Sequence, residues 1–241
     1  MTQEQPVVKV KDLVQRIGKK EILKGISFEV ASGEFYGIFG HGGSGKTTLL
    51  HIIAGIERFT GGMVEVLGFN VRKSEKFKKY QGIVTQQPSL FRELRAGENI
   101  DFIGALKGVD MKGAADLVER LGLKEHLKER TSALDAGVYK RLSLACALLG
   151  PPKLLLLDEP FSGIDLESQR LMLKEVRNFV DGGGTCIGCF SGIEVCAAVS
   201  SCGWLKDGTF TPMDPSALRE KWEEEVTKLY EKRDGENAES A

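Results

Sequence analysis

Residues suited to phosphate chemistry lie in a glycine-rich stretch near position 40. An apolar run of strand length, Phe35 to Phe39, leads into it, and residues with helical apolar spacing follow. Glycines let backbone N–H groups converge on an anion, and a helix N-terminus attracts negative charge. The stretch therefore predicts a phosphate-binding loop. Its residues are Gly40, His41, Gly42, Gly43, Ser44, Gly45, Lys46, Thr47 and Thr48.

Three side chains of this loop have distinct expected roles. The Lys46 ammonium should reach the β- and γ-phosphates of a nucleotide, and the Thr47 hydroxyl should bind Mg²⁺. The side chain of His41 is expected to be exposed and to take no part in the chemistry, because side chains of such a loop point away from the phosphates.

Two carboxylates follow a second apolar strand. Leu154 to Leu157 form an uninterrupted apolar run, typical of a central parallel strand buried on both faces, and Asp158 and Glu159 come directly after it. Asp158 is placed to hold Mg²⁺, and Glu159 to orient a water for in-line attack on the γ-phosphate. The alternative is an acidic strand end that faces solvent, which the upstream phosphate loop disfavours.

Hydrophobic spacing predicts the elements that position these residues. From Val7 to Val30, short segments in which apolar and polar residues alternate favour antiparallel strands. Apolar residues have helical spacing over 87–150, and patterns of strands and helices alternate from Leu154 to Phe190. We therefore predict an α/β protein, which with its phosphate loop resembles the P-loop NTPase (RecA-like) class. It combines a mainly parallel sheet core with an N-terminal antiparallel β subdomain and an inserted α-helical subdomain.

The chain is expected to form one such domain followed by a charged C-terminal segment. The predicted boundaries are 1–215 for the domain, with 1–86 and 151–215 as the core and β subdomain, 87–150 as the helical subdomain, and 216–241 as the C-terminal segment. In that segment Trp222, Val226 and Leu229 have the spacing of an amphipathic helix, and a disordered tail is expected from Asp234. We expect the helix to serve in packing or partner binding.

Composition excludes several classes of protein. The net charge of −1 over 241 residues offers no basic surface for nucleic acid. No apolar run approaches the roughly 18 residues that span a bilayer, and no signal peptide is recognisable, so we expect a cytoplasmic chain. The cluster of Cys186, Cys189, Cys196 and Cys202 could suggest zinc. However, Cys186 and Cys189 would point to opposite faces of a strand, which favours buried thiols.

Four motifs, in order, resemble those of the ATP-binding subunit of ABC transporters over nearly the whole chain. The phosphate loop matches Walker A, and Leu154 to Glu159 match Walker B with its catalytic carboxylate. Gln86 is similar to the Q-loop glutamine, which in that family reaches Mg²⁺ and couples the site to the helical subdomain. Ser162 to Asp165 match the D-loop, which communicates with the opposite site of a dimer.

The resemblance implies an ATPase that closes on a second nucleotide-binding subunit, as a homodimer or heterodimer, and drives separate integral membrane permease subunits. Its ligands would be ATP and Mg²⁺, and the chain would lie peripherally on the inner face of the cell membrane. The stretch from Gly122 to Asp165 resembles the exporter branch. The implied catalytic residues are Glu159, Lys46 and Gln86, and the implied metal ligands are Thr47, Gln86 and Asp158.

Three positions depart from the family's pattern. Ile17 stands where an adenine-stacking aromatic is expected, which should weaken adenine binding by about 1 kcal/mol. Asp135, within Leu134 to Val138, replaces the serine of the signature motif. Its carboxylate can cap its own helix, and it would repel a partner's phosphate by roughly 4 kcal/mol per unit-charge pair at about 4 Å. Phe190 or Ser191 stands in place of the switch histidine.

These departures predict slow or impaired hydrolysis by the weaker member of an asymmetric pair. Two alternatives are open: a soluble ABC ATPase outside transport, such as one for metal-cluster assembly, and a regulatory subunit that closes on ATP without hydrolysing it. The retained Glu159 disfavours the second alternative.

Overall fold

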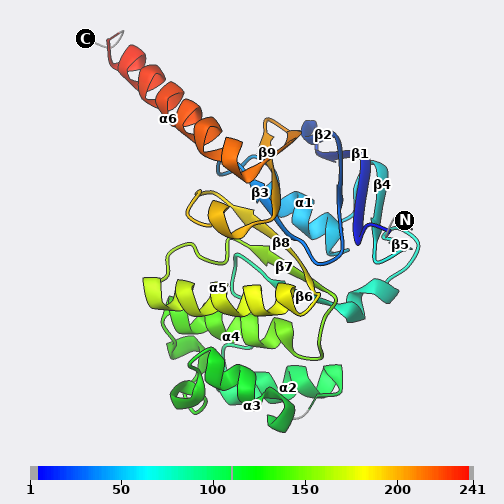
Figure 1. The fold of residues 1–241 in the computed structure, drawn as a ribbon, viewed down its shortest axis with the longest axis vertical. Coiled ribbons are helices and arrows are strands. Elements are labelled where there is room, and N and C mark those ends of the chain that lie inside the picture. The colour runs from blue at the N-terminus through cyan, green and yellow to red at the C-terminus, as the bar shows by residue number, and fades with distance from the viewer. Residues whose placement is uncertain (1–4, 110, 239–241) are drawn as a thin grey trace.

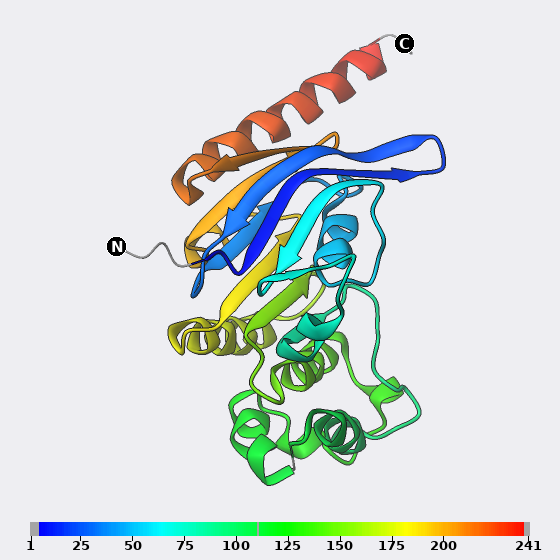
Figure 2. The same ribbon diagram turned by 90° about the vertical axis from the view of Figure 1, so that its right-hand side faces the viewer.

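Two β-sheets and the helices around them make up the computed structural model of the chain, which describes residues 5–109 and 111–238 (Figure 1). The α/β class, with a mostly parallel core and a separate antiparallel sheet, is confirmed. Figures 1 and 2 show the helices of the 87–150 region at one end of the molecule and the C-terminal helix at the other.

A six-stranded sheet forms the core, in the order β10-β9-β3-β8-β7-β6. All neighbouring strands are parallel except β10, which pairs antiparallel with β9. The strands are β3 (Phe35–Phe39), β6 (Gln81–Val84), β7 (Leu154–Asp158), β8 (Thr185–Phe190), β9 (Ser201–Lys206) and β10 (Thr209–Met213).

A four-stranded antiparallel sheet, in the order β2-β1-β4-β5, forms the predicted β subdomain. Its strands are β1 (Val8–Ile17), β2 (Lys20–Val30), β4 (Gly61–Val66) and β5 (Phe69–Asn70). The β1–β2 hairpin turns at Gly18, and β2 runs on through Gly25.

Helices cover both faces of the core sheet. The α-helices before the C-terminal one are α1 (Lys46–Ile53), α2 (Ala96–Lys107), α3 (Met111–Arg120), α4 (Ala136–Leu148) and α5 (Leu166–Asp181). Short 3₁₀ turns occur at η1 (Lys76–Tyr80), η2 (Lys124–His126), η3 (Thr131–Ala133) and η4 (Cys196–Ala198). Helices α2, α3 and α4 fall within the range predicted for the helical subdomain.

The core sheet separates two hydrophobic clusters. On β7, Leu155 and Leu157 join the cluster with α4 and α5, whereas Leu154 and Leu156 join the cluster with α1 and the antiparallel sheet. This strand is therefore buried on both faces, as its sequence predicts. On β8, Cys186 lies in the first cluster and Cys189 in the second, which confirms that their side chains point to opposite faces.

Helix α6 (Pro215–Ala238) projects away from the body of the molecule (Figures 1 and 2). It continues past Asp234, where we expected disorder; the helix before that point is rich in Glu, Lys and Arg, which have high helix propensity. Residues 239–241, and the side chain of Leu229, lie outside the described part. In that part, no helix is long and apolar enough to cross a membrane.

Strand register brings the candidate residues to one edge of the core sheet. The pairs at the carboxyl ends are Phe39 with Phe190, Cys189 with Asp158, and Leu157 with Val84. Because parallel strands end at the same edge, the residues that follow these positions meet there.

Candidate functional site

The phosphate loop turns between β3 and α1, and two of its glycines are needed for its shape. A side chain at Gly40 would lie 2.3 Å from the backbone oxygen of Leu205 on β9, so glycine alone fits there. Gly45 has a φ of 105°, in the region that favours glycine, and it is the N-cap of α1. The loop can therefore present backbone N–H groups at a helix N-terminus, which is a suitable arrangement for binding phosphate.

Lys46 lies buried at the centre of the site. Its ammonium donates to the carbonyl oxygens of Gly40 at 2.7 Å and His41 at 3.0 Å, and to the Ser191 hydroxyl at 3.0 Å. It also lies 3.4 Å from Glu159 Oε1, its nearest carboxylate. The loop's own carbonyls thus hold this cation where an incoming polyphosphate would replace Glu159 as its counter-ion.

Thr47 and Asp158 form the place for a metal ion. The Thr47 hydroxyl donates to Asp158 Oδ1 at 3.2 Å, and Asp158 Oδ2 is buried with no hydrogen-bond partner among the described residues. Burial raises the pKa of the Asp158 carboxyl, and the Thr47 hydrogen bond opposes that shift. An orphaned carboxylate oxygen beside a hydroxyl suits Mg²⁺, which prefers oxygen ligands, so the residues present fit the metal.

Glu159 is oriented by Ser191, the first residue after β8. The Ser191 backbone N–H donates to Glu159 Oε2 at 3.1 Å, and its hydroxyl donates to Oε1. Phe190 is the last residue of β8 and packs in the core with 4% exposure, so of the two residues considered for the switch position, Ser191 is the one whose side chain reaches Glu159. The serine hydroxyl accepts a hydrogen bond from Lys46 and donates one to Glu159, so it links these two side chains.

Gln86 follows β6 and shares a cavity with the other candidates. This cavity of about 260 Å³ is lined by Ile22, Gly42, Gly43, Gly45, Lys46, Thr47, Thr48, Gln86, Glu159 and Ser191. Lys140 on α4 donates to the backbone oxygens of Thr85 at 2.9 Å and Gln86 at 3.2 Å, and burial lowers its pKa while nearby carboxylates oppose the shift. This contact links the helical region to the cavity.

Ile17 lies at the end of β1 and is 58% exposed. It is not among the residues that line the cavity at the phosphate loop, whereas Ile22 on β2 is. A contact between Ile17 and adenine therefore stays a prediction.

Asp135 is the N-cap of α4, as its sequence context predicts. Its carboxylate accepts a hydrogen bond from the Val138 N–H at 2.9 Å. Gly137 packs so closely that a side chain there would lie 2.3 Å from Asp165 Oδ2 and 2.4 Å from the Ser168 hydroxyl oxygen. The signature segment thus packs against the N-terminus of α5, apart from the cavity that Lys46 lines.

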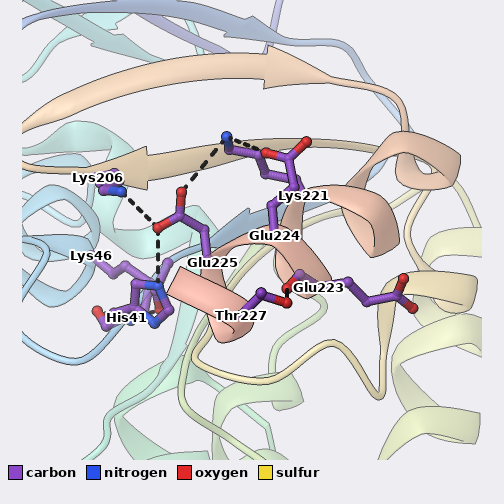
Figure 3. Close-up of polar contacts among 9 residues, drawn as sticks. His41, Lys46, Lys206, Lys221, Glu223, Glu224, Glu225 and Thr227 are labelled. Atoms are coloured by element: carbon purple, nitrogen blue, oxygen red, sulfur yellow. Dashed lines mark hydrogen bonds and ion pairs between the residues drawn. The ribbon is translucent and has the colours of Figure 1, made fainter. Parts of the chain in front are cut away.

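The side chain of His41 points away from the phosphate side of the loop, as expected, but it is partly buried rather than exposed. Its ring packs against Trp204 on β9 and Trp222 on α6, and its side chain is 32% exposed. Figure 3 shows His41 beneath α6, next to Glu225. Our prediction missed this because it considered the loop alone, whereas the C-terminal helix covers the loop's outer side.

Sequence reasoning also missed Lys140, Trp204 and Glu225 as neighbours of the site. The signal available for Lys140 was its place directly after the signature segment. No sequence signal identifies Trp204 and Glu225, because their approach to the loop depends on how β9 and α6 pack in three dimensions.

The family described as ABC transporter matches residues 23–162, more than half of the chain. The linearmycin resistance ATP-binding protein LnrL of Bacillus subtilis (strain 168) is 34% identical over 186 residues, which cover 75% of this chain and 60% of the relative. The bacitracin transport ATP-binding protein BcrA of Bacillus licheniformis is 31% identical over 176 residues, which cover 72% of this chain and 56% of the relative. The chain thus spans 60% or less of the length of these relatives.

Solved structures show the same fold. The dimer of the ATP-binding cassette MJ0796 bound to ADP and Pi, described as a post-hydrolysis state, matches with a TM-score of 0.80 at 24% identity, over 86% of this chain and 98% of that chain. From the family match and its curated relatives, we conclude that the chain belongs to the ABC transporter family.

Proposed function

We propose that this chain is the ATP-binding subunit of an ABC transporter, which binds Mg-ATP and couples its slow hydrolysis to separate membrane subunits. The observation that supports this most is the meeting of Lys46, Thr47, Gln86 and Glu159 around one cavity, with Asp158 buried beside Thr47. These residues come from three separate segments, and their types match the needs of phosphoryl transfer.

Each residue has a defined task in this proposal. Lys46 binds the β- and γ-phosphates, Thr47 and Asp158 hold the metal with Gln86, and Glu159 orients the attacking water and accepts its proton. Bound Mg²⁺ would neutralise charge on the phosphates. Before ATP enters, Glu159 serves as the counter-ion of Lys46 at 3.4 Å, so nucleotide binding would separate this pair and free the carboxylate.

Slow hydrolysis follows from the residue at the switch position. The Ser191 side chain is short, and its hydroxyl already accepts from Lys46 and donates to Glu159. It therefore holds the base but offers no second titratable group to the γ-phosphate or the water. The carboxylate can still act, so we propose reduced turnover rather than none.

The signature segment supports an asymmetric pair. Asp135 puts a carboxylate at the N-terminus of α4, where the family's signature would receive the phosphate of a partner's ATP. Such a charge repels phosphate, so the site that this chain completes on a partner would close poorly. A partner with an intact signature would complete this chain's own site, so we favour a heterodimer over a homodimer.

Membrane association and direction of transport are further parts of the proposal. The relatives named for linearmycin resistance and bacitracin transport support an exporter-type role. The described residues contain no membrane-spanning helix, so permease subunits would hold the chain at the inner face of the cell membrane.

The test is Mg-ATP binding and steady-state phosphate release by the purified chain, beside Glu159→Gln. We expect equal binding by both proteins, slow release by the wild type, and at least a 100-fold lower rate in Glu159→Gln, because general-base catalysis contributes about 10²–10⁴-fold. Binding without any release, also in the presence of membrane subunits, would contradict the proposed hydrolysis. Rapid release by the chain alone would contradict the proposed asymmetry.

A further inference from the structure

The C-terminal helix covers the outer side of the phosphate loop through aromatic contacts. The ring of His41 lies 5.9 Å from the ring of Trp222 on α6 and 5.4 Å from the ring of Trp204 on β9. The two tryptophan rings lie 6.0 Å apart and nearly perpendicular to each other. A loop residue thus forms one cluster with residues 163 and 181 positions away in the chain.

Charged contacts fix α6 in this position. Glu225 follows Trp222 by less than one helical turn, and its side chain is 6% exposed. Its carboxylate lies 2.6 Å from Lys206 Nζ and 3.7 Å from Lys221 Nζ, and its Oε2 atom lies 3.8 Å from His41 Nε2 (Figure 3). Displacement of the helix would separate this buried carboxylate from Lys206 on β9 and leave it only partners that move with α6, such as Lys221, which opposes the displacement.

His41 connects this cluster to the nucleotide site through its own backbone. Its carbonyl oxygen accepts from the Lys46 ammonium at 3.0 Å and from the Ser44 N–H at 3.2 Å. The ring on the outer side and the carbonyl on the inner side belong to the same residue. A shift of the ring would therefore move one of the three oxygens that accept hydrogen bonds from Lys46.

We propose that Trp222 is a positioning residue for nucleotide binding: by packing on the His41 ring it fixes the His41 carbonyl, and through it Lys46. This inference rests on the proposed binding of Mg-ATP at the loop. Lys46 contacts phosphate in the ground state and the transition state alike, so loss of the positioning contact should raise KM and leave kcat nearly unchanged. A role in helix packing alone would lower stability without this effect.

The experiment compares Trp222→Ala, Trp222→Phe and His41→Ala in the full chain, with Mg-ATP binding measured by calorimetry and turnover by phosphate release. Thr227→Ala is the matched control, because Thr227 is exposed on α6 and its hydroxyl bonds within the helix to Glu223. We expect Trp222→Ala to raise the Kd for Mg-ATP about tenfold, the size expected when one aromatic contact no longer holds the loop. Trp222→Phe should restore most of the affinity, and kcat should change less than about twofold.

A double-mutant cycle separates positioning from general destabilisation. The His41→Ala/Trp222→Ala double variant should bind Mg-ATP no more weakly than the worse single variant, because both changes remove one contact. Unchanged affinity in Trp222→Ala, or additive losses in the double variant, would overturn the inference while the proposed function stands. No Mg-ATP binding by the wild type and Thr227→Ala would overturn the proposed function itself.

If Trp222→Ala does not fold, Glu225→Gln serves as the second variant. It keeps the shape of the side chain and removes the charge that pairs with Lys206. It should raise the Kd for Mg-ATP several-fold, and an unchanged Kd in that variant would overturn the inference.

Discussion

The core half of the site, formed by Lys46, Thr47, Asp158 and Glu159, has charged groups that could bind an anion and a cation. In the signature segment, Leu134 to Val138, a carboxylate occupies the place where an anion could bind. In the core, Lys46 rests against Glu159, and one oxygen of Asp158 has no partner among the described residues. A bound anion could pair with Lys46, and a bound cation could be ligated by the free oxygen of Asp158. At the signature segment, by contrast, Asp135 already fills the N-terminus of α4. We therefore propose that the chain binds nucleotide in its own site and closes poorly on a partner's nucleotide.

On this proposal, the fold is retained although one of the two surfaces that would contribute to nucleotide sites in a dimer has changed. The α4 helix forms and packs normally, with Gly137 held against α5. A good N-cap stabilises such a helix by about 1 kcal/mol, and aspartate caps as well as serine. An aspartate at this position therefore need not weaken the fold, whereas we propose that it hinders the approach of a phosphate to the helix end.

The largest expected effect comes from the cation of the core half. Lys46→Ala should weaken Mg-ATP binding by about 100-fold or more, because it removes a buried charge-assisted contact to phosphate. Lys153→Ala is the matched control, since Lys153 is exposed before β7, at the opposite edge of the sheet. Equilibrium binding of Mg-ATP to both variants checks this. Near-normal binding of Mg-ATP by Lys46→Ala would contradict this account, because the core half would then not be the nucleotide site.

The metal site predicts a coupled change in affinity and stability. Mg²⁺ should strengthen ATP binding to the wild type about tenfold relative to EDTA, and Asp158→Asn should remove that difference. Without metal, Asp158→Asn should unfold at a higher temperature, because it removes a carboxylate whose pKa burial raises.

Calorimetric binding and thermal unfolding, each with Mg²⁺ and with EDTA, measure these two effects. A variant that keeps the Mg²⁺ enhancement would show that Asp158 is not a metal ligand.

The switch position should give a smaller effect, confined to turnover. Ser191→Ala should lower kcat several-fold, because Glu159 loses the hydroxyl that orients it, and Ser191→His should raise kcat about tenfold above wild type by supplying a titratable group. Steady-state phosphate release checks both, with Ser201→Ala as the matched hydroxyl deletion at the opposite end of β3. Equal rates in the wild type and both Ser191 variants would contradict our proposal that a serine at this position slows hydrolysis.

The smallest effect is expected at the adenine side. Ile17→Tyr should lower the Kd for Mg-ATP about fivefold, equivalent to roughly 1 kcal/mol of added stacking. Ile56→Tyr places the same aromatic at another isoleucine, which is 56% exposed, and should leave the Kd unchanged. Tighter binding in both variants would mean that the gain does not depend on a contact between residue 17 and adenine.

Local patterns predicted the core half well. The apolar run before Asp158 predicts a strand buried on both faces, and the glycine-rich turn predicts a loop between a strand and a helix. Strand and helix periodicities are local, so the sequence carries them directly. Even the N-cap at Asp135 could be predicted, because capping involves residues three apart.

Contacts between distant segments could not be predicted in this way. Ser191 and Glu159 are 32 positions apart, and their hydrogen bonds depend on β7 and β8 being neighbours in register. The packing of Trp222 on His41 depends on the direction in which α6 leaves the sheet. The length of α6 was underestimated because its charged residues suggested disorder, although they also favour helix.

The most direct test of the account is Mg-ATP-driven dimerisation of Glu159→Gln, followed by analytical ultracentrifugation with bound nucleotide measured in parallel. Blocked hydrolysis would let a closed dimer accumulate if the signature segment worked. We predict a chain that binds ATP and stays monomeric, and dimerisation when Asp135→Ser is added, since serine keeps the N-cap and removes the charge. A stable closed homodimer with Asp135 intact would contradict the account.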